Sequence, residues 1–306
     1  MLLTEKIKQT KLSPAETTII NFMLQHPFEL TQCSIQQLAK QLFVHPSTFI
    51  RLAKKMEFDG WLSFRQVFIE EQTYLKTRFQ TINPNIPFTA NDSEMLIASN
   101  IAQLESTTIM DSFDLLTPQK LKQAKKIFKQ TKQFKIFGSS GNLMVAKDFM
   151  LKMQRLNCPV EMSDVIGETM YQAYNTNPET CAILISYTGE NTAILNIAKM
   201  LKKKNTPIIA LTSIGENQLS KYSDCTLFLT TREKLYSKIA SFTINTSIAY
   251  LMDVLYSLYF SLNYDSHFKH ILSMGQMIDT RQSSSSIMQE EKSAITLQYQ
   301  DSFRPN

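Results

Sequence analysis

Five short apolar runs alternate with segments of helical length between residues 134 and 230, and this alternation limits the fold more than any other feature of the chain. The runs are FKIFG, PVEM, CAILIS, PIIALTS and CTLFLT. Each has the length and apolar character of a buried strand, and the helical segments between them allow consecutive strands to run in parallel. The pattern predicts an α/β domain: a parallel sheet with helices on both faces. A long helix from about Ser237 to Leu262 is expected to follow.

A helical domain is expected before the sheet. From Pro14 to Phe79 apolar residues recur at spacings of three and four, without alternating β-branched runs. The segment TINPNIPFTAND then brings two prolines and little periodicity, which is typical of a linker. A chain of 306 residues fits two such domains. The predicted organisation is an all-α domain over residues 1–80, a linker over 81–92, the α/β domain over 93–280 and a polar tail over 281–306.

Composition narrows the class of protein. The segment MLLTEKIKQTK turns polar after three residues, and no run of 18 apolar residues could span a bilayer, so we expect a cytoplasmic protein without a membrane partner. The four cysteines lie far apart without a C-x-x-C pair, which argues against a zinc cluster and a disulfide framework. We expect no metal and no cofactor. A net charge of +5 permits nucleic-acid binding without requiring it.

The segment CSIQQLAKQLFVHPSTFIRLAKKMEFDGW carries the signature of two short helices. Ser34 and Gln37 form a capping box that begins a helix running to about Leu42. A tight connection follows, and Pro46 opens a second helix that reaches about Met56. Two short helices joined in this way predict a helix-turn-helix.

The second helix sorts its residues by face. Phe49, Leu52, Ala53 and Met56 recur at helical spacing and should pack inward. The outward set is cationic and bears hydroxyls, which suits contacts with phosphates and base edges of operator DNA. The predicted DNA-binding residues are His45, Ser47, Thr48, Arg51, Lys54 and Lys55. The alternative is an ordinary solvated helix face, with His45 acting only as a helix cap.

Two loops after predicted strands are rich in hydrogen-bond donors. In an open parallel sheet, ligands bind beyond the carboxyl ends of the strands, where helix amino termini favour phosphate. The loop SYTGENT supplies Ser186, Thr188, Gly189, Asn191 and Thr192, and the loop FGSSGN supplies Gly138, Ser139, Ser140, Gly141 and Asn142. Together they predict a site for a phosphorylated, polyhydroxylated ligand. The alternative is that these side chains only cap helices. ATP and NAD are not expected, because G-x-x-x-x-G-K-[ST] and G-x-G-x-x-G are absent.

The order of these segments resembles the RpiR family of bacterial transcription regulators. The resemblance covers nearly the whole chain through LSPAETTIINFMLQHP, SIQQLAKQLFVHPSTFIRLAKKMEFDGWLSF, IFGSSGN, ILISYTGENTAILNIAKMLKKKNTPIIALTS and KIASFTINTSIAYLMDVLY. It implies an amino-terminal helix-turn-helix joined to a sugar isomerase (SIS) domain that binds phosphosugars.

The resemblance also implies roles for individual loop residues. The family's phosphate-binding S-x-[ST]-G motif maps onto Ser186, Thr188 and Gly189. Asn191 occupies the family's threonine position and Thr192 comes one later, so either is a candidate donor. In the first loop, Ser139 or Ser140 stands where family members often carry a second early glycine.

Two functions are compatible with these features. A sugar-phosphate isomerase with an accessory helical domain would need a general base, for which Glu190, Glu168 and Glu233 are the candidates, since no histidine lies between His45 and His267. The favoured alternative is not an enzyme: a DNA-binding regulator of sugar metabolism genes, controlled by a phosphosugar effector. We expect it to act as a homodimer or higher oligomer, with paired recognition helices reading operator half-sites about 34 Å apart.

Overall fold

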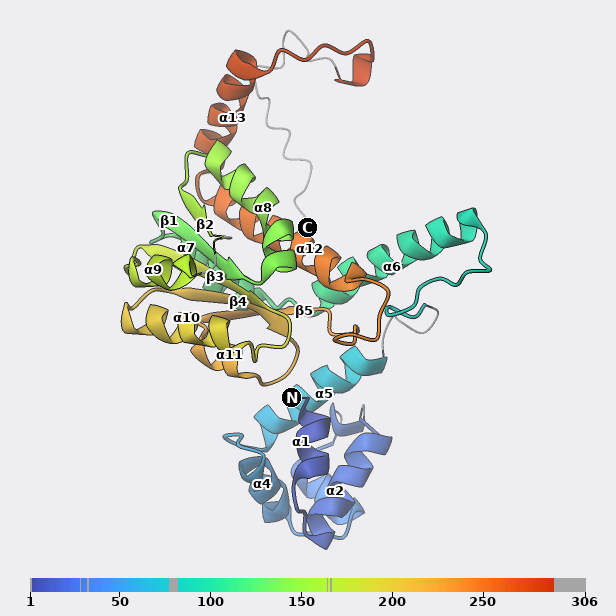
Figure 1. The fold of residues 1–306 in the computed structure, drawn as a ribbon. Coiled ribbons are helices and arrows are strands. Elements are labelled where there is room, and N and C mark those ends of the chain that lie inside the picture. Colours follow the sequence, from blue (N-terminus) through green and yellow to red (C-terminus); the bar gives the residue numbers. More distant parts are fainter. Residues whose placement is uncertain are drawn as a thin grey trace. The chain divides into compact units, whose positions relative to one another are not determined.

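The computed structural model describes residues 2–27, 29–31, 33–76, 82–163, 165 and 167–288, excluding the side chains of residues 31, 74–76, 140 and 286. The chain divides into two compact units, residues 1–263 and residues 264–306 (Figure 1). The first unit holds a helical domain and an α/β domain. The predicted boundary between residues 80 and 81 lies outside the described residues.

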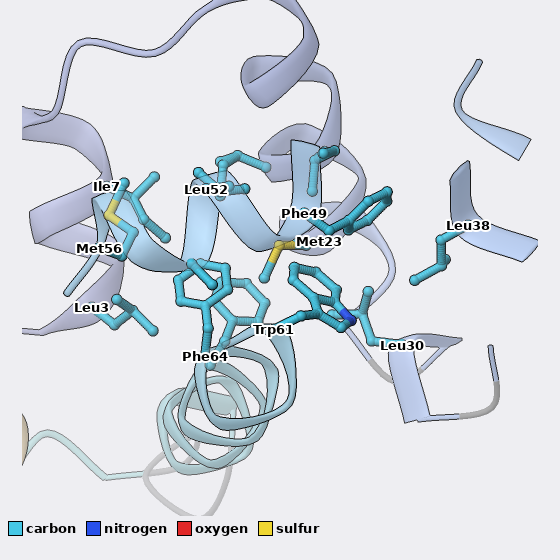
Figure 2. Close-up of a cluster of buried hydrophobic side chains, with 14 of the residues drawn as sticks. Leu3, Ile7, Met23, Leu30, Leu38, Phe49, Leu52, Met56, Trp61 and Phe64 are labelled. Carbon is cyan, nitrogen blue, oxygen red and sulfur yellow. The ribbon is translucent and has the colours of Figure 1, made fainter. Parts of the chain in front are cut away.

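The helical domain packs its helices around one apolar core. Its elements are α1 (Leu3–Gln9), α2 (Pro14–Gln25), the 3-10 turn η1 (Glu29–Thr31), α3 (Ile35–Gln41), α4 (Pro46–Lys55) and α5 (Trp61–Lys76). Capping boxes begin α2 at Ser13 and α3 at Ser34, because each serine accepts a backbone N–H in the first turn. Figure 2 shows the core, in which the Trp61 ring packs edge-on against Phe49 with the centroids 4.7 Å apart. The predicted helix-turn-helix is α3 and α4.

The α/β domain is built on a five-stranded, all-parallel sheet in the order β2-β1-β3-β4-β5. The strands are β1 (Gln133–Gly138), β2 (Val160–Met162), β3 (Thr180–Ser186), β4 (Ile208–Ser213) and β5 (Cys225–Leu229), which confirms the five predicted runs. Every residue of β3 is buried, as expected for a central strand covered on both faces. The chain reverses its direction of winding between β1 and β3, and such a switch point is where open α/β sheets bind ligands.

Helices form a layer on each face of the sheet (Figure 1). They are α6 (Glu94–Asp114), α7 (Pro118–Phe128), α8 (Ser140–Arg155), α9 (Glu168–Tyr174), α10 (Thr192–Lys203), α11 (Gln218–Tyr222) and α12 (Phe242–Phe260). The helix α12 packs against α6, α7 and α8, whereas α10 packs against α9 and α11. The four cysteines are free thiols, three of them buried. Among the described residues, none of the helices is long and apolar enough to cross a membrane.

The start of the last long helix differs from the prediction. We expected it to begin near Ser237, but α12 begins at Phe242. Residues 237–241 are irregular because Ile239 donates its N–H to the backbone oxygen of Asn85, and because the carboxylate of Glu233 accepts the N–H groups of Thr243 and Ile244 at the helix start. The helix therefore starts where its cap lies.

The second unit begins with a helix that the sequence pattern did not single out. It contains α13 (Tyr264–Ile278) and a 3-10 turn, η3 (Ser286–Met288), and the turn η2 (Ser261–Asn263) closes the first unit before it. Residues 289–306 of the predicted polar tail lie outside the described residues.

Candidate DNA-binding and effector sites

The helix α4 has the amphipathic character expected of a recognition helix. The inward residues Phe49, Leu52, Ala53 and Met56 are fully buried, while Ser47, Arg51 and Lys54 are exposed. His45 is the N-cap: its Nδ1 accepts the N–H of Ser47 at 3.3 Å and lies 2.7 Å from the Ser47 hydroxyl. The capping role considered for His45 is therefore present, and the ring itself remains exposed.

The expectation that Thr48 faces outward is wrong. Thr48 is 4% exposed, because it lies four residues before Leu52 and one before Phe49, on the edge of the inward stripe. Ile50, two residues later, is 46% exposed.

Lys55 is committed to an ion pair inside the domain. Its Nζ lies 2.7 Å from Oε2 of Glu16, a side chain of α2 that is 3% exposed, and Arg51 Nε lies 3.9 Å from the other oxygen. Burial alone would raise the pKa of Glu16, but hydrogen bonds from Lys55 and Ser13 outweigh it, and the net shift of this pKa is downward. The cationic charge that α4 offers to solvent is therefore mainly that of Arg51 and Lys54.

The two predicted ligand loops leave the same edge of the sheet from neighbouring strands. Gly138 at the end of β1 pairs with Ile185 at the end of β3, so the segments after Gly138 and after Ser186 start side by side. The first leads into α8 and the second into α10, each a helix of more than ten residues. Two helix amino termini, where backbone N–H groups lack partners within the helix and the macrodipole has its positive end, thus begin beyond the carboxyl ends of adjacent strands. This arrangement favours an anion.

The S-Y-T-G turn is shaped by its glycine. Gly189 donates its N–H to the Ser186 oxygen at 3.1 Å and has a φ of +69°, in the left-handed region that favours glycine. A Cβ at Gly189 would lie 2.2 Å from atoms of the Asn217 side chain. Asn217 is 3% exposed and donates to Thr212 Oγ1 and to the Ser213 oxygen, both at 3.2 Å. Only glycine fits against this fixed amide.

The polar residues of the second loop divide into caps and exposed donors. Asn191 is the N-cap of α10, and its Oδ1 accepts the N–H of Ile194 at 3.2 Å. Thr192, the first residue of that helix, and Thr188 are exposed, while Ser186 is buried at the end of β3. The Thr188 hydroxyl accepts the N–H of Glu190 at 3.2 Å and keeps its proton for donation. Asn191 therefore acts as a helix cap, as the alternative interpretation expected, whereas the hydroxyls of Thr188 and Thr192 can still donate to a ligand.

In the loop over residues 138–142, the N-cap side chain is not used for capping. Ser139 is the N-cap residue of α8, but its exposed side chain makes no capping bond within the described part of that helix. Gly138 and Asn142 are half-buried, and Gly141 is exposed with open space around it. The side chain of Ser140 lies outside the described part of the structure.

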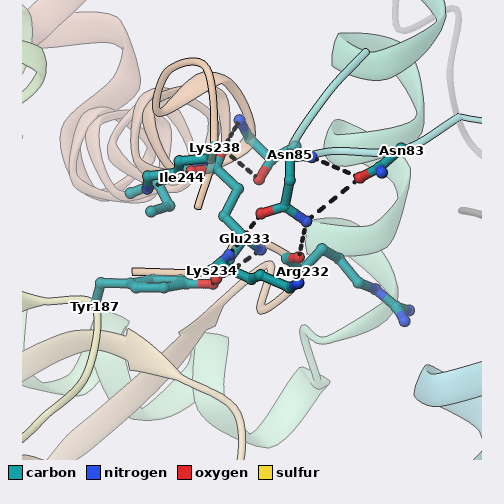
Figure 3. A network of polar contacts seen from close by, with 9 residues as sticks. Asn83, Asn85, Tyr187, Arg232, Glu233, Lys234, Lys238 and Ile244 are labelled. Carbon is teal, nitrogen blue, oxygen red and sulfur yellow. Dashed lines mark hydrogen bonds and ion pairs between the residues drawn. The ribbon is translucent and has the colours of Figure 1, made fainter. Parts of the chain in front are cut away.

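A hydrogen-bond network beside the S-Y-T-G turn was not predicted from the sequence (Figure 3). The Tyr187 hydroxyl donates to the backbone oxygen of Glu233 at 2.8 Å and accepts its N–H at 3.2 Å. Burial, together with the charge of Glu233, raises the pKa of Tyr187 to about 12, so the hydroxyl keeps its proton. Tyr187 and Glu233 lie 46 residues apart, so no local sequence motif predicts this contact.

The same network reaches the segment that follows the helical domain. The Asn85 side chain accepts the N–H of Lys234 at 2.7 Å and donates to the oxygen of Arg232 at 3.3 Å, so it holds both neighbours of Glu233. The backbone oxygen of Asn85 also accepts the N–H of Ile239 at 2.9 Å.

Two of the three carboxylates considered as general bases have other partners. Glu190 Oε1 accepts the N–H of Gln218 at the start of α11, at 3.0 Å. The Glu233 side chain is fully buried, caps α12 through Thr243 and pairs with Lys238 at 2.7 Å. Glu168 is an exposed residue in the first turn of α9.

Comparisons with known proteins agree with both domains. Residues 1–73 match the family model of the helix-turn-helix domain, rpiR family, and residues 126–258 match that of the SIS domain. An HTH-type transcriptional regulator of Caldanaerobacter subterraneus subsp. tengcongensis is 23% identical over 278 residues, covering 89% of this chain and 94% of that protein. Another, from Haemophilus influenzae, is 23% identical over 249 residues, covering 81% of this chain and 85% of that protein.

Solved structures share the fold. The Vibrio vulnificus NanR protein, complexed with ManNAc-6P, is 16% identical with a TM-score of 0.55, covering 90% of this chain and 96% of that one. The sugar isomerase domain of an RpiR transcription factor from Sphaerobacter thermophilus is 12% identical with a TM-score of 0.51, covering 58% of this chain and 98% of that one. With an rpiR-type helix-turn-helix followed by a SIS domain, the chain belongs to the RpiR family of transcription regulators.

Proposed function

We propose that this protein is a DNA-binding transcription regulator of sugar metabolism genes whose activity is controlled by a phosphosugar bound in the SIS domain. The observation that carries the proposal is the S-x-T-G turn at the switch point between β1 and β3, in the same chain as a helix-turn-helix with exposed Arg51 and Lys54. The similar NanR protein is described in complex with ManNAc-6P, a ligand of the proposed class.

The effector's phosphate is held, in this proposal, by the hydroxyls of Ser186 and Thr188 and by the amide-rich turn at Gly189. Thr192 is the proposed fourth donor rather than Asn191, because the Asn191 side chain already caps α10. The loop over residues 138–142 binds the sugar from the neighbouring strand, with the hydroxyl of Ser139, which makes no capping bond within the described part of α8, as a donor.

The SIS domain senses its ligand rather than converting it, in this proposal. An isomerase base must reach a substrate carbon with a carboxylate able to take up a proton. The carboxylates of Glu190 and Glu233 each accept a backbone N–H at a helix amino terminus, and Glu233 is also paired with Lys238. These commitments favour a structural role for both acids.

The direct test is fluorescence anisotropy of the purified protein on DNA from upstream of its own gene and of neighbouring genes. We expect salt-sensitive, saturable binding of two chains per operator, changed by one member of a panel containing N-acetylmannosamine 6-phosphate, glucosamine 6-phosphate, fructose 6-phosphate, arabinose 5-phosphate and inorganic phosphate. The same samples are followed by NMR for conversion of each sugar. Conversion without DNA binding at any salt concentration would favour the isomerase instead.

The effector site and the linker are coupled, we propose, through the network around Glu233. Tyr187 lies inside the S-Y-T-G turn and holds the Glu233 backbone from one side, and Asn85 holds both neighbouring residues from the other. Asn85 belongs to the predicted linker, so a change in the turn on phosphate binding reaches that segment through few bonds. A ligand acts on DNA binding only to the extent that it favours one arrangement of these elements.

Removing one link of this network should uncouple the two sites. Tyr187→Phe and Asn85→Ala should each keep DNA affinity and effector affinity within about twofold. The factor by which the effector changes DNA affinity, typically about 5 to 150 for coupled sites, should approach one. Tyr236→Phe and Asn91→Ala are matched controls, since Tyr236 is exposed in the segment that follows Glu233 and Asn91 is exposed in the predicted linker. Full coupling in Tyr187→Phe would contradict this route.

A further inference from the structure

Four residues other than glycine adopt the left-handed backbone conformation in the described part of the chain. They are Phe43, Glu57, Asn157 and Asn205, with φ between 53° and 68°. Each comes one residue after the C-cap of a helix and donates its N–H back into the last turn, as Phe43 does to the Lys40 oxygen. This position normally takes glycine or asparagine, because a Cβ there crowds the backbone.

For three of the four residues, a structural feature offsets the cost of the left-handed backbone conformation. Asn157 and Asn205 are of the residue type that tolerates this conformation best after glycine. Glu57 accepts a hydrogen bond from Lys6 Nζ at 2.6 Å. Phe43 is the exception: its side chain is 96% exposed, the highest value of any large apolar side chain that the structure describes. Its ring therefore contributes no burial to folding and occupies a position where glycine would be favoured.

The place of Phe43 indicates what its ring contacts. It lies in the turn between α3 and α4, two residues before the N-cap of α4. In a helix-turn-helix bound to DNA, the second helix enters the major groove with its amino-terminal residues at the bases, and the first helix crosses the backbone, so the turn between them lies beside the duplex. Exposed cations surround this turn in the sequence, at Lys40 before it and at Arg51 and Lys54 after it. An anionic duplex is the partner that suits this charge.

We propose that Phe43 is a DNA contact of this regulator, packing its ring against an apolar part of the operator: the C5-methyl group of a thymine or the carbons of a deoxyribose. The inference rests on the proposed DNA-binding function. Backbone strain without benefit to folding is found where a residue serves a binding surface, and here the surface is that of the helix-turn-helix. The ring adds a contact that the cationic side chains of α4 cannot make.

The test is Phe43→Gly in the full chain, compared with the wild type by thermal unfolding and by anisotropy on the operator fragment. Glycine relieves the backbone, so the midpoint of unfolding should rise by a few degrees. Operator affinity should nevertheless fall by about tenfold, the size of one apolar anchor. The slope of log affinity against log salt should stay unchanged, because no phosphate contact is lost. A more stable protein that binds DNA more weakly is not expected from a purely structural residue.

Two controls separate the outcomes. Asn157→Gly makes the same backbone change in the SIS domain and should leave operator affinity unchanged. Probes with uracil in place of thymine identify the group that the ring contacts. If the wild type no longer binds these probes more tightly than Phe43→Gly does, the contact is the thymine methyl group. If the wild type still binds them more tightly, the contact is the deoxyribose. Equal affinities of Phe43→Gly and wild type would overturn the role of Phe43 alone. Failure of the wild type to bind any fragment would instead overturn the proposed function.

Discussion

The double variant Ser186→Ala, Thr188→Ala should bind the phosphosugar effector about 100-fold or more weakly than the wild type. Each hydroxyl is proposed to donate to a charged phosphate, and hydrogen bonds to charged groups are worth about 1.5–3 kcal/mol each. Two such losses correspond to two or more powers of ten in affinity. Isothermal titration with the panel phosphosugar that changes DNA binding most would measure this directly. DNA affinity without effector should be retained, because both residues lie in the SIS domain.

The neighbouring pair Asn191 and Thr192 supplies a matched control for this experiment. Thr192→Ala should weaken the effector, since its exposed hydroxyl begins α10 at the phosphate site. Asn191→Ala should lower the free energy of unfolding by about 1 kcal/mol through loss of the N-cap, with little change in effector affinity. The reverse pattern would move the phosphate contact to Asn191. Normal effector binding by the Ser186, Thr188 double variant would show that the phosphate is held elsewhere.

Replacing Arg51 and Lys54 together with alanine should weaken operator binding by about 100-fold at physiological salt, since each contributes a contact worth about 1–3 kcal/mol. If both contact phosphates, the slope of log affinity against log salt should fall by about 1.8, at about 0.9 for each contact. Both residues are exposed on α4, so the fold should be retained. Anisotropy titrations across a series of salt concentrations measure both quantities. An unchanged affinity together with an unchanged slope would place the DNA-binding face on another helix.

Lys55 is the matched contrast on the same helix. Lys55→Ala should leave the salt slope nearly unchanged but lower the free energy of unfolding by about 1–2 kcal/mol, because the buried carboxylate of Glu16 loses its partner. The pKa of Glu16 is lowered in the folded protein, so in the wild type this carboxylate contributes stability above its unfolded pKa, near 4.5, which is lost as pH falls through the folded pKa. Lys55→Ala should flatten this acid dependence in unfolding curves measured from pH 3 to 7.

Local sequence patterns were sufficient for most features that depend on neighbours along the chain. The five strands, the serine cap of α3 and the inward stripe of α4 follow from periodicity and capping. The position of Thr48 was missed because an inward stripe is wider than four apolar residues, and its edge is polar here. The start of α12 was missed because the groups that hold residues 237–241 out of the helix are Glu233 and Asn85, and the second lies far away in the sequence.

The fold class and the two donor-rich loops could be deduced from residue order, since strand, turn and cap signals act over a few residues, whereas the family was recognised from the resemblance of the ordered segments to RpiR regulators. The commitment of Lys55 to Glu16, the engagement of Tyr187 and Asn85 with the segment around Glu233, and the packing of Asn217 against Gly189 depended on the folded chain. The hydrogen-bonded pairs join residues 39 to 149 positions apart, and the amide and the glycine meet only in a particular loop geometry. The strengths of these contacts depend on interatomic distances and burial in the folded molecule. Periodicity along the chain does not predict either quantity.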